Sequence, residues 1–290
     1  MRNYSIVFGY CLAVALLGCG GGSAVDGGQD RGPTLTTGKS FSVSGEAALT
    51  CDLSCGGEQD QALSYQTPSG LQIGVTAVEL LRSATDPSPH RLLAATPAKE
   101  VDLVAGATFA AVDIGSIPEG TYTHMQVSVA WVRFDAAATA HANDMTIPGT
   151  LTVDYAVSSY ADPAQGPRSA GDYLASFCAF GSTLAQAGSH PVEFPPPYPG
   201  ATVDASAGTY RVRFAMADGP VTIDHGSPTS VDAAVTFYIE DALGWRDLSV
   251  PGYTTGVLDL APDAAASEQP ESMAIRGFSV SVVEDEALTP

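Results

Sequence analysis

The chain has 290 residues, a formal net charge of −20 and 45% hydrophobic residues. Its twelve Lys and Arg residues form no cluster, and an acidic surface repels nucleic-acid phosphates, so we expect no nucleic-acid partner. The same charge argues against adhesion to anionic lipid through side chains. The apolar content is enough for a sizeable core.

The N-terminal segment is typical of a secretory signal. Arg2 supplies one positive charge, and residues 4–17 are almost wholly apolar or small. This apolar run is too short to cross a bilayer as a helix, which takes about 20 residues. We therefore expect residues 1–18 to be a cleaved signal peptide for export.

The end of the signal indicates lipid attachment. Leu16-Leu17-Gly18-Cys19 resembles the lipobox of bacterial lipoproteins. The resemblance implies cleavage before Cys19 and acylation of its thiol and new amine. In enterobacterial lipoproteins, an aspartate directly after the lipidated cysteine retains the protein at the inner membrane. This chain has Gly20 at that position, so the resemblance favours the outer membrane. The alternative is an ordinary cleaved signal with an incidental cysteine.

The next segment is a tether. Residues 19–39 are rich in glycine and have no apolar periodicity, so a flexible linker is expected between the lipidated cysteine and the body. Residues 40–290 form that body, a size near the upper limit for one all-β domain.

Apolar residues recur every second position along much of the body, which predicts strands with one buried and one wet face. This alternation is typical of antiparallel sheets. The expected core-facing sets are Phe41, Val43, Gly45, Ala47, Leu49; Leu71, Ile73, Val75, Ala77; Tyr210, Val212, Phe214, Met216; Val231, Ala233, Val235, Phe237, Ile239; and Phe278, Val280, Val282.

Turn chemistry separates these runs. Pro118 and Gly120 favour a turn before the run that begins at His124. Within that run, Trp131 is expected on the same face as Met125, Val127 and Val129. The best helical candidate covers residues 261–273, bracketed by prolines and with only alanines as regularly spaced apolar residues, so at most a short surface helix is expected there.

Residues 158–203 differ from the rest in their many prolines. We interpret them as a loop-rich insert in an antiparallel β-sandwich. The alternative is two smaller β domains that divide near residue 165. The predicted fold class is all-β in either case.

A family resemblance follows from these strands and turns. Ile117-Pro118-Glu119-Gly120-Thr121-Tyr122 resembles the L-P-x-G-x-Y strand–turn–strand of exported bacterial β-sandwich modules. The order of this motif after Val101-Asp102-Leu103 and before Phe237-Tyr238-Ile239 resembles an uncharacterised lipoprotein family. The resemblance implies a transthyretin- or immunoglobulin-like sandwich without known catalysis, and the segment 158–203 departs from it.

Three cysteines remain in the body after Cys11 leaves with the signal and Cys19 takes lipid. One disulfide among Cys51, Cys55 and Cys178 is expected in an oxidising compartment, with three pairings open. A metal site built from these three is a weaker alternative, because no His or Cys lies nearby at zinc-finger spacing.

The sequence contains no recognised catalytic pattern. None of the five histidines has H-E-x-x-H spacing, and G-x-S-x-G, S-x-x-K and P-loop motifs are missing. Carboxylate pairs such as Glu240-Asp241 and Asp259/Asp263 are expected by chance in so acidic a chain. We therefore predict no catalytic residue, no metal site and no cofactor. Structural calcium is kept as an alternative because acids crowd the late strands at Asp224, Asp232, Glu240, Asp241 and Asp247.

Aromatic residues in or beside the insert suit a carbohydrate platform. They are Tyr155, Tyr160, Tyr173, Phe194 and Tyr198. The other interpretation is that these rings cover a sheet edge or cap the core.

Taken together, these features predict a lipid-anchored, non-catalytic envelope protein with a structural or binding role. Its expected partners are the membrane, through its lipid, and a glycan or another envelope protein. The alternatives are a carbohydrate-binding or adhesion lipoprotein and an unrecognised envelope hydrolase.

Overall fold

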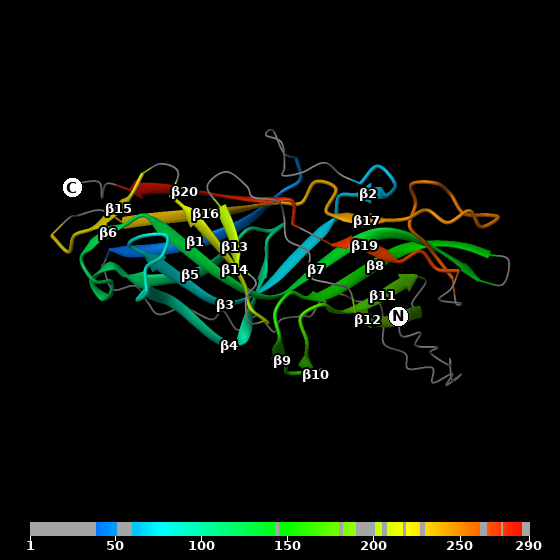
Figure 1. The fold of residues 1–290 in the computed structure, drawn as a ribbon, viewed down its shortest axis with the longest axis horizontal. Coiled ribbons are helices and arrows are strands. Elements are labelled where there is room, and N and C mark those ends of the chain that lie inside the picture. The colour runs from blue at the N-terminus through cyan, green and yellow to red at the C-terminus, as the bar shows by residue number, and fades with distance from the viewer. Residues whose placement is uncertain are drawn as a thin grey trace.

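The computed structural model is an elongated molecule built almost entirely of strands (Figure 1). It describes residues 39–50, 60–142, 145–179, 182–189, 201–204, 208–216, 219–226, 230–261, 266–273 and 275–285. The described elements include one complete 3₁₀ turn, η1 (Ile114–Ser116). No described helix has the length and apolar character needed to span a membrane.

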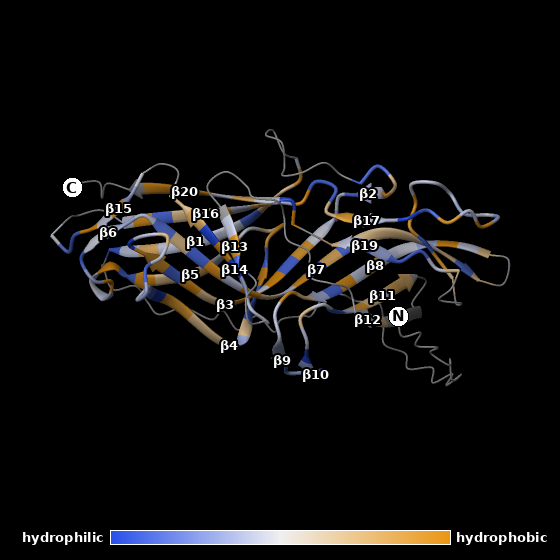
Figure 2. Ribbon diagram, viewed as in Figure 1, coloured by the Kyte–Doolittle hydropathy of each residue, from blue (hydrophilic) through white to orange (hydrophobic). Residues whose placement is uncertain are grey.

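A four-stranded sheet forms one layer. Its order is β20 (Gly277–Asp285), β16 (Ser230–Tyr238), β1 (Ser40–Ala48) and β5 (Ala107–Asp113). β1 and β16 pair in parallel, and the other two pairs are antiparallel. Apolar and polar residues alternate along these strands, as the predicted period of two requires (Figure 2).

A nine-stranded sheet forms the other layer. Its main path runs through β12 (Ser182–Ser189), β11 (Asp172–Ala179), β8 (Met145–Ala156), β7 (His124–Ala142), β14 (Tyr210–Ala215) and β13 (Ala201–Asp204). β3 (Gly70–Leu81) pairs with β7 and β4 (His90–Asp102), and β18 (Asp259–Leu260) also pairs with β7.

Three small sheets complete the body. They are β6 (Gly120–Tyr122) with β15 (Val221–Ile223), β9 (Tyr160–Asp162) with β10 (Gly166–Arg168), and β2 (Ser64–Gln66) with β17 (Leu243–Trp245) and β19 (Pro270–Met273). β19 is a strand within residues 261–273, where at most a short surface helix was expected. Residues 158–203, predicted as a loop-rich insert, contain β9 to β13.

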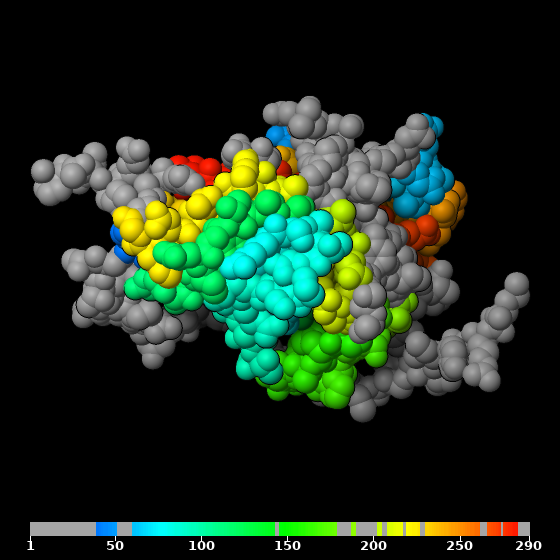
Figure 3. Space-filling view, turned by 60° about the vertical axis from the view of Figure 1, so that its left-hand side comes forward, coloured from blue at the N-terminus to red at the C-terminus, as the bar shows by residue number. Residues whose placement is uncertain are grey.

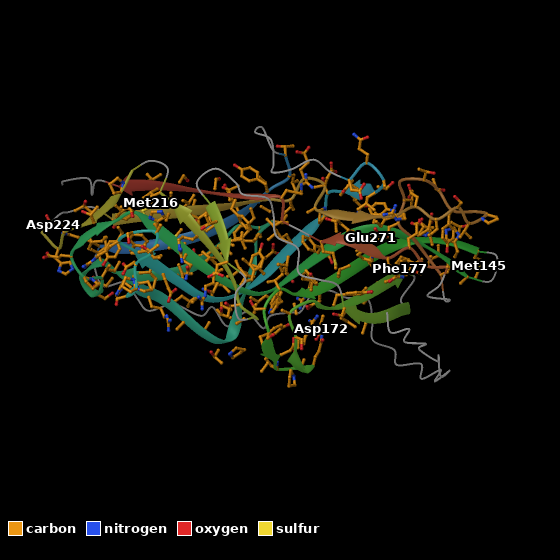
Figure 4. The ribbon with its side chains drawn as sticks, in the orientation of Figure 1. Met145, Asp172, Phe177, Met216, Asp224 and Glu271 are labelled. Atoms are coloured by element: carbon orange, nitrogen blue, oxygen red, sulfur yellow. The ribbon has the colours of Figure 1, made fainter. Side chains whose placement is uncertain are left out.

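β7 links two regions of different construction. In the sandwich half, the four-stranded sheet covers β3, β14 and the first part of β7 (Figure 1). In the distal half, the second part of β7 pairs with β8, and β2, β17 and β19 lie above them. Figure 4 marks the two ends of the molecule, with Asp224 at the end of the sandwich half and Met145 at the tip of the β7–β8 hairpin.

A β-bulge reverses the alternation of β7 between the halves. Val129 pairs with Val75, whereas Trp131 pairs with the preceding residue, Gly74, so Ala130 is an extra residue. The core-facing residues are therefore Val127 and Val129 before the bulge and even-numbered residues after it. The expectation that Trp131 shares a face with Val129 is wrong, because the extra residue turns its side chain to the opposite face.

Ser158 joins the two halves where β14 and β8 meet along the same edge of β7. Its buried hydroxyl donates to Val129 O (2.6 Å) and accepts from Tyr210 N (2.7 Å), and its amide donates to Ala130 O (2.9 Å). These bonds satisfy backbone groups that the change of partner strand would leave unpaired.

Candidate functional site

Arg133 lies at the centre of a polar surface on the face of β7 opposite the core. Its Nη2 and Nε donate to Asp154 Oδ2 (2.9 and 3.3 Å), and its Nη1 donates to Gln72 Oε1 (2.9 Å). The guanidinium also lies 4.8 Å from the centroid of the Trp131 ring, and the outward turn of that ring follows from the bulge. Gly74 leaves room for the indole, since a Cβ at this position would overlap it.

The β9–β10 hairpin adds a buried ion pair to this surface. Arg168 and Asp154 are 8% and 6% exposed, and Arg168 Nη1 donates to Asp154 Oδ1. Burial disfavours the charged guanidinium, but the hydrogen bond and charge of Asp154 outweigh it and raise the pKa of Arg168. Burial, followed by the charge of Asp154, raises the pKa of Tyr160 to about 12. Asp154 is thus shared by two arginines, and this fixes the Arg133 side chain in place.

A hollow of about 160 Å³ opens beside Arg133, between the start of β3, the end of β4 and the middle of β7. Its lining residues are Ser69, Gly70, Leu71, Gln72, Asp102, Val104, Arg133 and Asp135. A Cβ on Gly70 would lie 2.7 Å from Asp135 Oδ2, so the glycine leaves space for that carboxylate. In Figure 3 the cyan surface of the β3–β4 region lies next to the bright green surface of residues around 150–175.

The polar groups of the hollow are only partly used within the protein. Asp135 Oδ1 accepts from Thr152 Oγ1 (2.6 Å), and Asp102 Oδ1 accepts from the amides of Val104 and Ala105 (3.0 and 3.1 Å). Within the described part of the chain, the second carboxylate oxygen of each aspartate accepts no hydrogen bond. Gln72 likewise keeps its amide nitrogen as a donor, because only its oxygen bonds to Arg133.

The distal half contains a second polar cluster, which fastens a segment we call the strap (residues 246–261 and 266–269). Asp259 is 1% exposed and bonds through Oδ1 to His141 Nε2 (2.7 Å) and through Oδ2 to Thr254 N (2.8 Å). Tyr253 packs on the His141 ring at 4.6 Å between centroids. Glu268, 2% exposed, accepts from Leu248 N and Asp259 N (2.7 Å each).

This cluster has the composition of a catalytic dyad, and its hydrogen bonds also hold the strap in place. Each oxygen of Asp259 and Glu268 already accepts a hydrogen bond that fastens the strap to itself or to β7. Burial, the largest cause, raises the pKa of Glu268 and also that of Tyr253. Sequence reasoning missed the His141–Asp259 pair, since no local spacing signals a contact between residues so far apart in the chain.

The aromatic residues considered for a binding platform separate in the structure. Tyr155 is 1% exposed and belongs to the core, so it offers no ring face to a ligand. Tyr173 pairs with Tyr155 across the strands and bonds to Gln269, whereas Tyr160 lies with Arg168 on the polar surface. Phe194 and Tyr198 lie outside the described residues.

The other candidate residues are dispersed or already engaged. Cys178 is disulfide-bonded, and Cys19, Cys51 and Cys55 lie outside the described residues. Of the acids considered for calcium, Asp232 bonds to Ser42 and Asp247 to Ser64. Among the residues that the structure describes, no group of three or more His, Cys, Asp or Glu side chains could hold a metal ion.

No family model matches the chain, and no curated protein or solved structure is significantly similar to it. The assignment of a function therefore depends on the residues and the geometry of this chain.

Proposed function

We propose that this protein is a lipid-anchored, non-catalytic β-sandwich module of the bacterial outer membrane with a structural or binding role. The observation that carries the proposal is Leu16-Leu17-Gly18-Cys19 at the end of an apolar, signal-like segment. Acyl chains contribute about 0.8 kcal/mol per buried CH₂, so several chains on Cys19 would anchor the body stably. The glycine-rich residues 20–39 would hold it clear of the headgroups.

The chemistry of the body supports a role without catalysis. Two histidine–carboxylate pairs lie in the described ranges, His141 with Asp259 (2.7 Å) and the more exposed His225 with Glu119 (3.6 Å). In the closer pair both carboxylate oxygens accept hydrogen bonds, and the imidazole is stacked against Tyr253. A general base needs a reachable proton on a substrate, and here the carboxylates bond to the strap instead. The partly unused groups around Arg133 favour a binding role over a purely structural one.

Metabolic labelling with a palmitate analogue in a bacterial host, followed by mass spectrometry of the N-terminal peptide, tests the anchor. We expect acylated Cys19 as the first residue and the protein in the outer-membrane fraction. The Cys19→Ser variant should lose the label and leave the membrane. Cys11→Ser is the matched control, because this cysteine is removed with the signal and its loss should change neither result. An unmodified Cys19 in the exported wild-type chain would refute the proposal.

A further inference from the structure

We propose that the hollow beside Arg133 binds one hexopyranose ring, either a free sugar or the end of a glycan. The inference deepens the proposed function by naming a ligand class, and it rests on the binding role rather than on the lipid anchor. Its basis is the set of hydrogen-bonding groups in the hollow, which the fold holds in place and does not use up.

The unused groups match the hydroxyls of a sugar. The second carboxylate oxygens of Asp102 and Asp135 are acceptors, and the amide nitrogen of Gln72 is a donor. A ring with neighbouring hydroxyls can donate to the carboxylates and accept from the amide. Val104, which is 49% exposed at the rim, offers an apolar contact for the C–H groups of the ring.

The groups are also held rigidly before a ligand arrives. Gln72 is fixed by Arg133, which is fixed in turn by Asp154 and Trp131. Asp135 is held by Thr152, and Asp102 by two backbone amides. Because less side-chain freedom is lost on binding, preorganised groups of this kind bind more tightly than mobile ones.

The size and the charge of the hollow limit the class of ligand that it can bind. At about 160 Å³ the hollow is smaller than the pockets of about 300–1,000 Å³ that hold drug-sized ligands and cofactors, so it admits a single sugar ring. Two carboxylates disfavour acidic sugars. The charge of Arg133 is paired with Asp154 and Glu100, and among the described residues no group of three or more His, Cys, Asp or Glu side chains could hold a bare divalent cation here. We therefore expect neutral or amino hexoses to bind and uronic acids to be rejected.

The test is a titration of the full chain in a detergent without a sugar headgroup. Methyl hexosides of the gluco, galacto and manno series, their oligosaccharides, glucuronic acid and Ca²⁺ are added separately and followed by calorimetry and saturation-transfer NMR. We expect saturable, millimolar binding of at least one neutral hexoside. Asp102→Asn and Asp135→Asn should each weaken that binding about tenfold, because a hydrogen bond to a charged acceptor is lost.

Asp113→Asn is the matched control, since Asp113 is an exposed aspartate that also caps a backbone amide, that of Gly115, away from the hollow. It should leave the affinity unchanged. Hydrogen exchange supplies a second measurement, with ligand-induced protection expected at residues 69–72 and 102–104. Comparable affinity for the hexoside and its oligosaccharide would indicate the free sugar, and tighter oligosaccharide binding would indicate a glycan end.

Four results would overturn the inference. They are no saturable hexoside binding by the wild type, hexoside binding that both aspartate variants retain, glucuronic acid binding as tight as that of the neutral sugar, and Ca²⁺ binding that depends on the same two aspartates. A chain acylated at Cys19 that binds no hexoside would refute this inference while leaving the anchor in place.

Discussion

The sandwich half and the distal half share the strand β7 but are stabilised in different ways. The sandwich half has apolar side chains on both facing sheets, including an edge-to-face series that runs from Phe214 through Phe278 and Phe237 to Phe109. The distal half has small residues such as Ala136 and Ala138 along β7, and part of its cover is the strap. Burial of apolar side chains is enough to stabilise two sheets packed face to face, because each sheet pairs its own backbone groups. A loop that covers a sheet also needs hydrogen-bond acceptors for its backbone amides.

The largest expected effect is on the sandwich half. Phe237→Ala should lower the free energy of unfolding by about 3–5 kcal/mol, because it removes a fully buried ring that contacts two other phenylalanines. Thermal or denaturant unfolding measures the loss. Val283→Ala on the neighbouring β20 is the control, since Val283 is 59% exposed and its change should stay within about 0.5 kcal/mol. Equal losses would contradict the account of this core.

A loss of stability of similar size is expected for a substitution between the halves. Asp154→Ala should cost about 3–5 kcal/mol, because it leaves the buried Arg168 without its counter-charge. The double variant Asp154→Leu with Arg168→Met should recover part of this loss, since it removes the unpaired buried charge of Arg168, while the partly exposed Arg133 keeps Glu100 as a partner at 3.6 Å. If the double variant were as unstable as the single one in chemical denaturation, the ion pair would not be the cause.

A smaller and more local effect is expected for the strap. Glu268→Gln should cost about 1–3 kcal/mol, because an amide side chain can accept from only one of the two backbone amides that Glu268 now serves. Hydrogen exchange should accelerate at Leu248 and Asp259 while the sandwich half keeps its protection. Uniform acceleration over both halves would show that the strap and the sandwich unfold together.

The pH dependence of stability should also distinguish the strap from the sandwich half. Burial raises the pKa of Glu268 above its ordinary value of 4.5, so the folded state holds this proton more tightly than the unfolded state does. Its contribution to stability is present below pH 4.5 and is lost as the pH rises through the raised pKa. As the pH rises from 4.5 through the raised pKa, the wild type should therefore lose unfolding free energy relative to Glu268→Gln, which has no carboxyl group to titrate at this position. The opposite slope would refute the assigned shift.

The smallest effect is expected at the exposed edge of the distal half. Arg246 and Glu271 form an ion pair at 3.2 Å, but their side chains are 49% and 40% exposed. Solvent screens such a pair, so Arg246→Ala should change the free energy of unfolding by less than about 1 kcal/mol. A larger loss in a denaturant titration would mean that Arg246 supports the strap through packing.

The sequence was most informative where a signal was local. Alternation along β1, β14, β16 and β20 predicted their buried faces, because successive strand residues point to opposite sides. The same rule failed at Trp131, since the bulge at Ala130 arises from pairing with β3. Local sequence was also a poor guide at β19, at the end of the segment where at most a short surface helix was expected, because pairing with β17 makes these residues a strand.

The candidate sites were predicted less well than the strands. No local pattern connects Gln72, Asp102 and Asp135 of the hollow, because three strands bring them together. The same holds for His141 with Asp259, which meet only because β18 pairs with the end of β7. The aromatic platform was one of two interpretations of rings that are near in sequence, and Tyr155 follows the other one, because strand pairing directs it into the core.

The sequence alone determined that the body is all-β, since side-chain alternation is a property of the local chain. It also carries the whole basis for the expected lipid anchor at Cys19, because a signal peptide is recognised as a linear motif. Tertiary structure alone decided the parallel pairing of β1 with β16, the reversal of faces in β7 and the groups that meet in the hollow. The physical reason is that hydrogen bonds and packing between distant strands, rather than local preference, set register and therefore which side chains converge.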